Sequence, residues 1–302
     1  MSARRALVTG AAGFVGANLV RRLLRDGWEV EPVVSPASEA WRLEGLAVAV
    51  RRADLREPEA LAGVRADVVF HLAAHGAYSW ETDTDRIHAT NVEGTRGLLA
   101  AVGDAVVVHA GSSSEYGRKD HAPAEDEPAE PDSDYARAKL AATELVHEHG
   151  GVTLRLYSAY GPWEEPNRLV PTLVGHALRG ELPPLVAPDT ARDFVYVEDV
   201  CDAFVRAVDA PRGAVLNVAS GRQTTLREIV AMVREQLGVE VEPDWGTMDN
   251  RSWDTSTWVG DATRARELLG WEATTPLADG LRATAGWLRG EGAATGRYAG
   301  GG

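Results

Sequence analysis

The first 27 residues constrain the fold more than any other part of the chain. An apolar run, RALVTG (5–10), ends at a glycine, and FVGANLVRRLLRDG (14–27) carries its apolar side chains on one helical face. Between them Gly10, Gly13 and Gly16 are spaced three residues apart. Glycines at these positions let the backbone turn tightly and approach a pyrophosphate, which the amino end of the helix then faces. This order of strand, glycine-rich turn and helix predicts a dinucleotide-binding unit, and a plain tight turn is the alternative.

Apolar runs and amphipathic helices alternate as far as residue 160. We expect strands at 28–34, 48–55, 66–74, 105–112 and 152–161, and helices at 90–102 and 134–150. Strands that are continuously apolar are typical of a parallel sheet covered on both faces. The alternation therefore predicts the α/β class, with a doubly wound parallel sheet of the Rossmann type.

Proline and tryptophan become frequent after residue 160, and the pattern changes. Further strands are expected at 194–200 and 214–220, and further helices at 198–209, 225–237, 262–269 and 277–289. We interpret this part as a smaller C-terminal substrate domain that is partly interleaved with the first. The predicted dinucleotide-binding domain covers 1–160 and is joined by about 193–216, the substrate domain covers 161–192 and 217–290, and the Gly/Ala-rich segment 291–302 is a disordered tail.

The charge balance and the single cysteine argue against several classes of protein. The 302 residues carry a net charge of −14, which argues against nucleic acid or an anionic membrane as the main partner. One cysteine, Cys201, cannot form an intrachain disulfide or a thiolate cluster, and the histidines show no metal-ligand spacing. The N-terminal apolar run is too short and too polar for a signal peptide or a membrane span. We therefore expect a cytoplasmic protein without a metal.

The segment YARAK (135–139) holds one of only two lysines in a chain that otherwise uses arginine; the other is Lys119. Tyr135 and Lys139 are one helical turn apart. A tyrosine hydroxyl titrates at about 10, and a neighbouring ammonium stabilises the phenolate and lowers that pKa. A lysine also reaches a ribose hydroxyl, and arginine is no substitute for it there. The spacing indicates either a catalytic pair or two side chains that share a helix surface.

The cofactor specificity depends on the segment after the second expected strand. The acid that usually holds the adenosine ribose, about 20 positions after the glycine turn, is absent, and Val34 or Ser35 stands there. Ser35, Ser38 and Arg42 can instead receive a 2′-phosphate, which favours NADP(H) over NAD; an ordinary loop is the alternative. Asp54, after the third expected strand, can reach the adenine amino group or be a turn residue.

Eight motifs follow one another along the chain. They are TGAAGFVG, DL at 54–55, HLAA at 71–74, TNVEGT at 90–95, SSSEYG at 112–117, Tyr135-x-x-x-Lys139, YGP at 160–162 and RDFVYVEDV at 192–200. With these motifs the chain resembles the extended short-chain dehydrogenase/reductases from residue 4 to about residue 290. Within that family it is similar to the nucleotide-sugar epimerases, dehydratases and 4-ketoreductases.

The resemblance implies roles for individual residues. Tyr135 is the catalytic acid/base, Lys139 anchors the nicotinamide ribose and lowers the tyrosine pKa, and Ser112 is the catalytic hydroxyl, or Ser113 if the turn has a deletion. Contacts with NAD(P) are implied for Gly10, Gly13, Phe14, Val15, Gly16, Ser35, Arg42, Asp54, Leu55, Leu72, Ala73, Ala74, Asn91, Tyr135, Lys139 and Tyr157. Contacts with the sugar substrate are assigned to His75, Ser114, Ser158, Arg168 and Arg192. Arginine suits a diphosphate through its bidentate fork, and a surface ion pair is the alternative for the two arginines.

Two departures from the family pattern bear on the reaction. Sugar dehydratases of the family carry an acid two residues before Tyr116, where this chain has Ser114, and Glu115 lies one place off. Dehydration is therefore disfavoured unless the turn is shifted. Ser158 replaces the asparagine that the family often has before YGP, which leaves its substrate contact open.

The resemblance thus predicts an NAD(P)-dependent enzyme that acts on a nucleoside-diphosphate sugar. Hydride moves at a sugar carbon, C4, as in a reversible epimerase. The alternatives are an NADPH-dependent 4-keto-sugar reductase, a sugar 4,6-dehydratase and a non-catalytic NADP-binding sensor. A homodimer is also implied, in which the helices around 82–102 and 135–149 of each chain form a four-helix interface.

Overall fold

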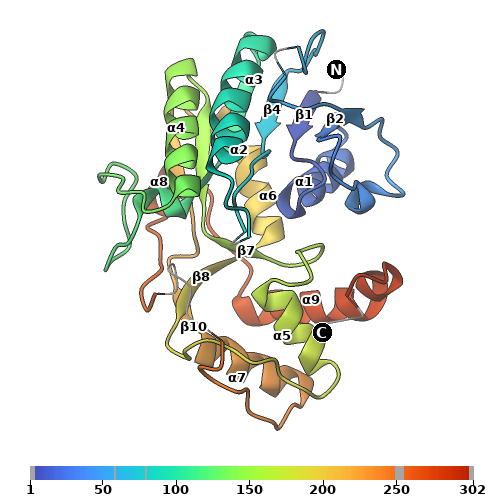
Figure 1. The fold of residues 1–302 in the computed structure, drawn as a ribbon, viewed down its shortest axis with the longest axis vertical. Coiled ribbons are helices and arrows are strands. Elements are labelled where there is room, and N and C mark those ends of the chain that lie inside the picture. Colours follow the sequence, from blue (N-terminus) through green and yellow to red (C-terminus); the bar gives the residue numbers. More distant parts are fainter. Residues whose placement is uncertain (1–3, 58, 79, 249–254, 299–302) are drawn as a thin grey trace.

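The computed structural model describes residues 4–57, 59–78, 80–248 and 255–298. Figure 1 shows two parts, with the N-terminal strands and their helices in the upper part and α5 (Leu169–Ala177), α7 (Leu226–Leu237) and α9 (Leu277–Trp287) in the lower. Within the described residues, no helix is both long and apolar enough to cross a membrane.

The upper part is built on a parallel sheet of seven strands, counted over the described residues. In spatial order they are β3 (Arg51–Arg52), β2 (Glu29–Val34), β1 (Arg5–Thr9), β4 (Val68–His71), β5 (Val106–Ser112), β6 (Val152–Leu156) and β9 (Val215–Val218). Every neighbouring pair in this sheet is parallel. The strand order reverses between β1 and β4, and open α/β sheets bind ligands at such a switch point. The predicted doubly wound sheet of the Rossmann type is confirmed.

Helices cover both faces of this sheet, which explains the continuously apolar strands. They are α1 (Phe14–Arg25), α3 (Gly94–Val102), α4 (Asp134–His149), α6 (Val197–Arg206) and, leading into α3, α2 (Thr84–His88) with the π-helical turn Ala89–Glu93. Phe70 of β4 belongs to the core that α1 and α6 cover, whereas its neighbour Val69 belongs to the core that α3 and α4 cover. Successive residues of β4 therefore point into two separate cores. Figure 1 shows the two helix layers on either side of the strands.

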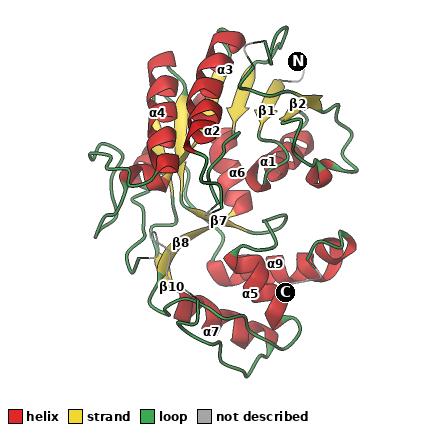
Figure 2. Cartoon of the chain, in the orientation of Figure 1, coloured by secondary structure: helices red, strands yellow, loops and turns green. Residues whose placement is uncertain are grey.

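The lower part has its own small sheet and its own core. The strands are β10 (Gln223–Thr225), β8 (Ala191–Tyr196) and β7 (Ser158–Tyr160), in that spatial order. Leu173 of α5, Ile229 of α7 and Leu281 of α9 meet in one apolar cluster. Figure 2 shows β7 and β8 at the junction of the two parts, with these three helices below them.

Two elements differ from the sequence-based expectation. The strand expected over 152–161 divides at Tyr157, so that β6 joins the large sheet and β7 the small one. The helix expected over 262–269, α8 (Thr263–Leu269), packs with β9 and places Ala265 in the core of the upper part. The sequence predicts that this helix belongs to the substrate domain, because it lies within that part of the chain. Its packing shows instead that it belongs to the upper part.

The expected disordered tail also differs over the residues that the structure describes. Tyr298 packs against Trp41 and Trp287, with ring centroids 6.4 and 5.1 Å away. Its hydroxyl donates to the carbonyl oxygen of Glu164 at 2.6 Å. Two of these partners, Trp41 and Glu164, lie far away in the sequence, so the Gly/Ala-rich composition of 291–298 does not reveal them. The end of the predicted tail, 299–302, lies outside the described residues.

Candidate functional site

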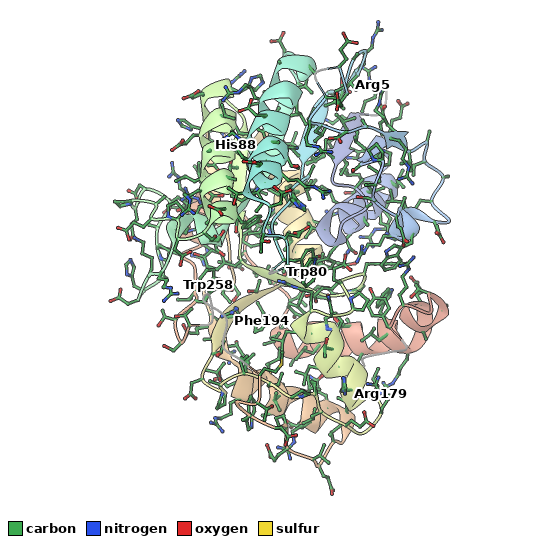
Figure 3. The ribbon with its side chains drawn as sticks, in the orientation of Figure 1. Arg5, Trp80, His88, Arg179, Phe194 and Trp258 are labelled. Carbon is green, nitrogen blue, oxygen red and sulfur yellow. The ribbon has the colours of Figure 1, made fainter. Side chains whose placement is uncertain are left out.

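A large cleft of about 1650 Å³ lies between the two parts, at the carboxyl ends of β1, β4 and β5. Trp80, Phe194 and Trp258, which Figure 3 labels near the junction of the parts, are on its wall. The same wall contains the predicted site residues Gly10, Gly13, Phe14, Val15, Gly16, Ser35, Arg42, Asp54, Leu55, Leu72, Ala73, Ala74, His75, Ser112, Ser113, Ser114, Tyr135, Lys139, Tyr157, Ser158, Arg168 and Arg192. Asn91 is the predicted site residue that does not line the cleft.

The glycine-rich turn between β1 and α1 forms the wall next to the sheet. Gly10 adopts a φ of +67°, and a Cβ on it would lie 2.6 Å from the backbone nitrogen of Ala73. A Cβ on Gly16 would lie 2.2 Å from the carbonyl oxygen of Gly10. Gly13 is the N-cap of α1, and no side chain caps this helix, so its first N–H groups can bind an anion. The turn therefore fits the pyrophosphate of a dinucleotide.

Ser112 ends β5 and is held by a short capping box. Its backbone N–H donates to Oε1 of Glu115 at 2.7 Å, and its Oγ accepts from the backbone N–H of Ser114 at 3.2 Å. Glu115 is fully buried, and its other oxygen accepts from Nε of Arg155 at 2.9 Å and from the hydroxyl of Thr143 at 3.1 Å. Glu115 thus points into the interior and orients Ser112. Sequence reasoning missed this role because an acid in the turn gives no sign of its direction.

Tyr135 lies in the first turn of α4, whose N-cap Ser133 accepts from the backbone N–H of Ala136 at 3.1 Å. Burial raises the pKa of the Tyr135 phenol to about 12, and a hydrogen bond with Ser112 acts in the opposite direction. Ser112 and Tyr135 both line the large cleft. Ser113 is buried beside them and also lines a second, smaller pocket.

Lys139 lies one turn further along α4 and is only 3% exposed. Its Nζ is 3.0 Å from Nε2 of His109 on β5. Burial lowers the pKa of the Lys139 ammonium to about 8. Lys139 is therefore a buried cation beside the cleft, which excludes the interpretation of YARAK as a pair on a helix surface.

His71 of the HLAA motif stacks on His109 behind the cleft, with ring centroids 5.4 Å apart. Its Nδ1 is 2.7 Å from the hydroxyl of Thr9, and its Nε2 is 2.8 Å from the hydroxyl of Thr95. Burial, followed by the nearby charge of Lys139, lowers the pKa of His71 to about 3 and the pKa of His109 well below its usual value. Across the described ranges, no group of three or more His, Cys, Asp or Glu residues is arranged to hold a metal.

Asn91 supports the loop that follows β4. Its amide nitrogen donates to the carbonyl oxygen of His75, and its amide oxygen accepts from the backbone N–H of His75, both at 2.8 Å. The imidazole of His75 in turn lies 2.9 Å from the carboxylate of Glu81. The structure thus gives Asn91 an indirect part in shaping the cleft, where the sequence predicts a direct cofactor contact.

Arg42 was expected to bind a 2′-phosphate, but its guanidinium has partners within the protein. The side chain is 3% exposed, and Nε donates to the carbonyl oxygen of Trp163 at 2.7 Å. Nη1 donates to the carbonyl oxygen of Ala12 at 3.1 Å, and Nη2 lies 2.8 Å from the carboxylate of Glu165. Arg42 therefore connects the glycine-rich turn to the segment that enters the lower part.

Another arginine lies beside the two serines that were predicted to receive the phosphate. Nη1 of Arg52 donates to the carbonyl oxygens of Ser35 at 3.3 Å and Ser38 at 2.6 Å. Arg52 belongs to β3, which is all that remains of the strand expected over 48–55. Asp54 follows, and its carboxylate is bound by Arg56 at 2.5 Å. Only the pairing of β3 with β2 brings Arg52 to this loop.

Aromatic rings line the cleft near Arg168 and Arg192. Arg168, the N-cap of α5, has its guanidinium carbon 5.9 Å from the ring centroid of Tyr78. Tyr78 stacks on Trp80, with centroids 4.6 Å apart and ring planes within 9° of parallel. Arg192 lies 5.8 Å from the ring of Trp258. The aromatic residues after β4 were missed, because one aromatic pair in a loop has no periodicity that marks a site.

Glu164 also lines the cleft and was missed. Its side chain is buried, and burial raises the pKa of its carboxyl to about 8. The neighbouring Arg168 acts in the opposite direction on that pKa. One carboxyl oxygen of Glu164 makes no hydrogen bond within the described part of the chain.

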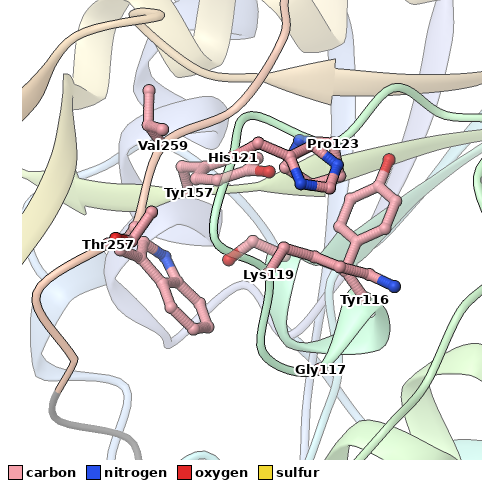
Figure 4. A pocket seen from close by; sticks show the side chains of 10 residues that line it. Tyr116, Gly117, Lys119, His121, Pro123, Tyr157, Thr257 and Val259 are labelled. Carbon is pink, nitrogen blue, oxygen red and sulfur yellow. The ribbon is translucent and has the colours of Figure 1, made fainter.

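A second pocket lies behind Ser113 and is much smaller. Figure 4 shows it between Tyr116, Tyr157 and Thr257, with Lys119 and His121 at its rim. Its volume of about 20 Å³ has room for little more than one water molecule. The large cleft is therefore the candidate active site.

Comparisons with known proteins agree with this geometry. Residues 6–219 match the model of the NAD dependent epimerase/dehydratase family. The chain is 35% identical to a UDP-glucose 4-epimerase of Mycolicibacterium smegmatis, over 94% of this chain and 98% of that protein. It is 32% identical to a dTDP-glucose 4,6-dehydratase of Streptomyces griseus, over 93% of each chain.

Solved structures show the same architecture. The UDP-glucose 4-epimerase of Thermotoga maritima with UDP-glucose superimposes with a TM-score of 0.87 at 27% identity, covering 94% of this chain and 98% of that one. The UDP-glucuronic acid 4-epimerase of Bacillus cereus, in complex with UDP-glucuronic acid and NAD, gives 0.82 at 26% identity and covers 94% and 99%. With its fold, its glycine-rich turn and these matches, the chain belongs to the NAD-dependent epimerase/dehydratase family.

Proposed function

We propose that this protein moves a hydride at a carbon of a nucleoside-diphosphate sugar, C4, with NAD(P) as cofactor and Tyr135 as acid/base. The observation that carries the proposal is that Ser112, Tyr135 and Lys139 line the same cleft as the glycine-rich turn. The UDP-sugars and the NAD in the similar solved structures support the same classes of ligand.

The residues of the chain divide the work between proton transfer and orientation. A bound nicotinamide supplies or accepts the hydride and, when oxidised, brings a positive charge. Tyr135 takes the proton of the sugar hydroxyl during oxidation and returns it during reduction, while Ser112 holds the same oxygen. Because the pKa of Tyr135 is raised to about 12, chiefly by burial, a positive charge must stabilise its phenolate at neutral pH. We assign that task to Lys139 together with the cofactor.

We propose that Arg168 and Arg192 bind the diphosphate of the sugar nucleotide. Both side chains line the cleft on the side of the lower part. Arg168 also precedes the first turn of α5, so an anion beside it meets the amino end of that helix. Guanidinium groups bind phosphate oxygens in a bidentate manner, which suits this assignment.

Among the reactions of the family we favour reversible epimerisation, with 4-keto-sugar reduction as the alternative. Dehydration needs an acid near Ser114, and the adjacent carboxylate of Glu115 is bound by Arg155 in the interior. Glu115 is not on the wall of the cleft. A non-catalytic sensor has no need of Tyr135 and Lys139, which are both present.

Analysis of the purified protein tests the proposal. An epimerase is expected to retain a tightly bound nicotinamide dinucleotide, NAD or NADP, detected by mass spectrometry, and to convert UDP-glucose into its C4 epimer without added cofactor. A reductase is expected to consume added NADPH in the presence of a 4-keto-sugar nucleotide. Absence of nicotinamide-nucleotide binding, measured by calorimetry with NAD and NADP, would contradict both.

We also propose a homodimer through α2, α3 and α4. Figure 1 shows these helices side by side on one side of the upper part, and α4 contacts both α2 and α3. Ile87, Val92 and Ala138 form a small apolar cluster between them, with Ala141 and Leu145 packed against it. Light scattering at micromolar concentration is expected to give twice the chain mass, and a monomeric mass contradicts the proposal.

A further inference from the structure

The buried contact between Lys139 and His109 has a defined direction. An ammonium group has only donors, so Nε2 of His109 must accept from Nζ of Lys139 across their separation of 3.0 Å. An imidazole nitrogen that accepts carries no proton. The ring of His109 is therefore neutral, with its proton on Nδ1, which lies 3.4 Å from the hydroxyl of Thr153.

The hydrogen bonds of His71 specify the opposite tautomer. The hydroxyl of Thr95 donates its proton to the carbonyl oxygen of Asn91 at 2.6 Å. The hydroxyl oxygen of Thr95 therefore accepts from Nε2–H of His71 at 2.8 Å. Nδ1 of His71 then accepts from the hydroxyl of Thr9 at 2.7 Å. With both nitrogens bound, His71 cannot rotate, and it stacks against His109 on the side away from Thr153.

The groups that face Lys139 leave it few other partners. His109 and His71 approach from β5 and β4, Tyr135 precedes Lys139 on α4, and Glu115 acts on it from the turn after β5. Glu115 favours the charged ammonium, but its oxygens accept from Arg155, Thr143 and Ser112. An ammonium buried in this way loses free energy if no acceptor meets it. Among the residues that the structure describes, His109 is the acceptor within hydrogen-bond distance of Lys139.

We propose that His109 is a positioning residue of the active site, whose neutral Nε2 accepts one hydrogen bond from Lys139 and so fixes the direction in which the remaining ammonium protons point. The proposal rests on the proposed function only where it gives Lys139 a part in the reaction. The contact itself can be tested without turnover.

The first experiment observes the tautomers directly. Protein labelled with ¹⁵N only in histidine is examined by NMR between about pH 6 and pH 8, and His109→Gln and His71→Gln assign the signals. We expect His109 to be neutral with its proton on Nδ1, and His71 to be neutral with its proton on Nε2. In Lys139→Met the tautomer of His109 is expected to change or become mixed, because Nε2 has lost its donor. A proton on Nε2 of His109 in the wild type, or no response to Lys139→Met, would overturn the proposal.

The second experiment separates positioning from stability. His109→Phe retains a ring without an acceptor, whereas His109→Gln retains an oxygen that can accept from Lys139. We expect His109→Phe to lose about 10- to 100-fold in kcat, because small displacements of a catalytic group have effects of this size. In the pH profile of kcat, the alkaline limb of this variant is expected to move to lower pH. The reason is that an ammonium without an acceptor loses its proton more easily. His109→Gln is expected to recover most of both.

The outcomes distinguish this proposal from the proposed function. If the wild type turns over a nucleotide sugar and His109→Phe keeps its kcat and its alkaline limb, the positioning role is wrong and the function stands. If His109→Phe and His109→Gln lose activity equally with an unshifted limb, His109 has only a structural role, and the proposal fails. If the wild type turns over no nucleotide sugar, the proposed function fails, and the NMR result still decides the contact between His109 and Lys139.

Discussion

Glu115 and Arg155 form a buried ion pair, with Oε2 and Nε 2.9 Å apart, directly behind the serine turn of the cleft. The pair comes from the turn after β5 and from β6, and the other carboxylate oxygen of Glu115 holds the backbone of Ser112. The orientation of Ser112, which lines the cleft, thus depends on an ion pair that is buried.

Loss of one member of this pair is expected to destabilise the protein strongly. Arg155→Met leaves the carboxylate of Glu115 buried without its cation, which costs about 3–5 kcal/mol of the free energy of unfolding. The matched control is Arg137→Met, because Arg137 pairs with Asp134 on the exposed surface of α4 and should contribute less than about 1 kcal/mol. Urea denaturation of both variants measures the difference, and equal costs would contradict the assigned role.

Substitutions at the hydroxyl groups of the cleft test which serine acts with the tyrosine. Tyr135→Phe is expected to fold and to lose at least about 10²-fold in kcat, since the proton then has no carrier. Ser112→Ala should also lower kcat, because the Ser112 hydroxyl lowers the pKa of the phenol, and Ser113→Ala should affect it much less. Steady-state kinetics of the three variants decides; a larger effect of Ser113→Ala would move the catalytic hydroxyl to that residue.

The two lysines of the chain provide a matched pair of conservative substitutions. Lys139→Arg places a larger, planar group into a buried site against His109, and we expect a loss of at least about 10²-fold in kcat, or about 2.7 kcal/mol of barrier. Lys119→Arg should have little effect on kcat, because Lys119, which is 14% exposed and pairs with Glu130, does not line the large cleft. Near-wild-type turnover in Lys139→Arg would remove Lys139 from the mechanism.

The two buried histidines predict that stability falls in mild acid. Their folded-state pKa values lie below the ordinary value of 6.5, so below about pH 6.5 the unfolded chain binds more protons than the folded chain. The stabilisation is complete above about pH 6.5 and is lost as the pH falls, by about 1 kcal/mol per pH unit for each histidine. In His109→Gln the change in the free energy of unfolding with pH should be smaller by the contribution of one histidine. His88→Gln, at an exposed position, should leave that change as it is in the wild type. Urea titrations at about pH 7 and pH 5.5 compare the slopes.

Cofactor binding tests the loop after β2. We expect NADP to bind more tightly than NAD, because Val34 and Ser35 stand where a carboxylate would repel a 2′-phosphate. Arg52→Ala should weaken NADP by about 10-fold and leave NAD unchanged, since Arg52 lies beside Ser35 and Ser38. Arg42→Ala should instead lower stability and weaken both cofactors alike, because its guanidinium binds the glycine-rich turn. Tighter binding of NAD, measured by calorimetry, would refute the preference.

The sequence alone determined the fold class and the location of the cleft. Gly10 adopts a φ of +67°, and a Cβ on Gly16 would collide with the carbonyl oxygen of Gly10, so the spacing of these two glycines reflects a local geometric requirement. The same holds for the alternation of apolar runs and for Tyr135 and Lys139, which one helical turn brings to one side of α4. Patterns of this kind depend on neighbours within a few residues of each other.

Only the tertiary structure decided where the polar side chains point. The burial of Arg42, the inward direction of Glu115, the contact between His109 and Lys139, and the return of α8 to the upper core all join segments that are 30 or more residues apart. Each depends on which acceptor or apolar surface the packed fold places opposite the side chain. A polar residue looks the same in the sequence whether it faces a ligand or satisfies a buried partner, because the direction of its side chain follows from packing and not from local spacing.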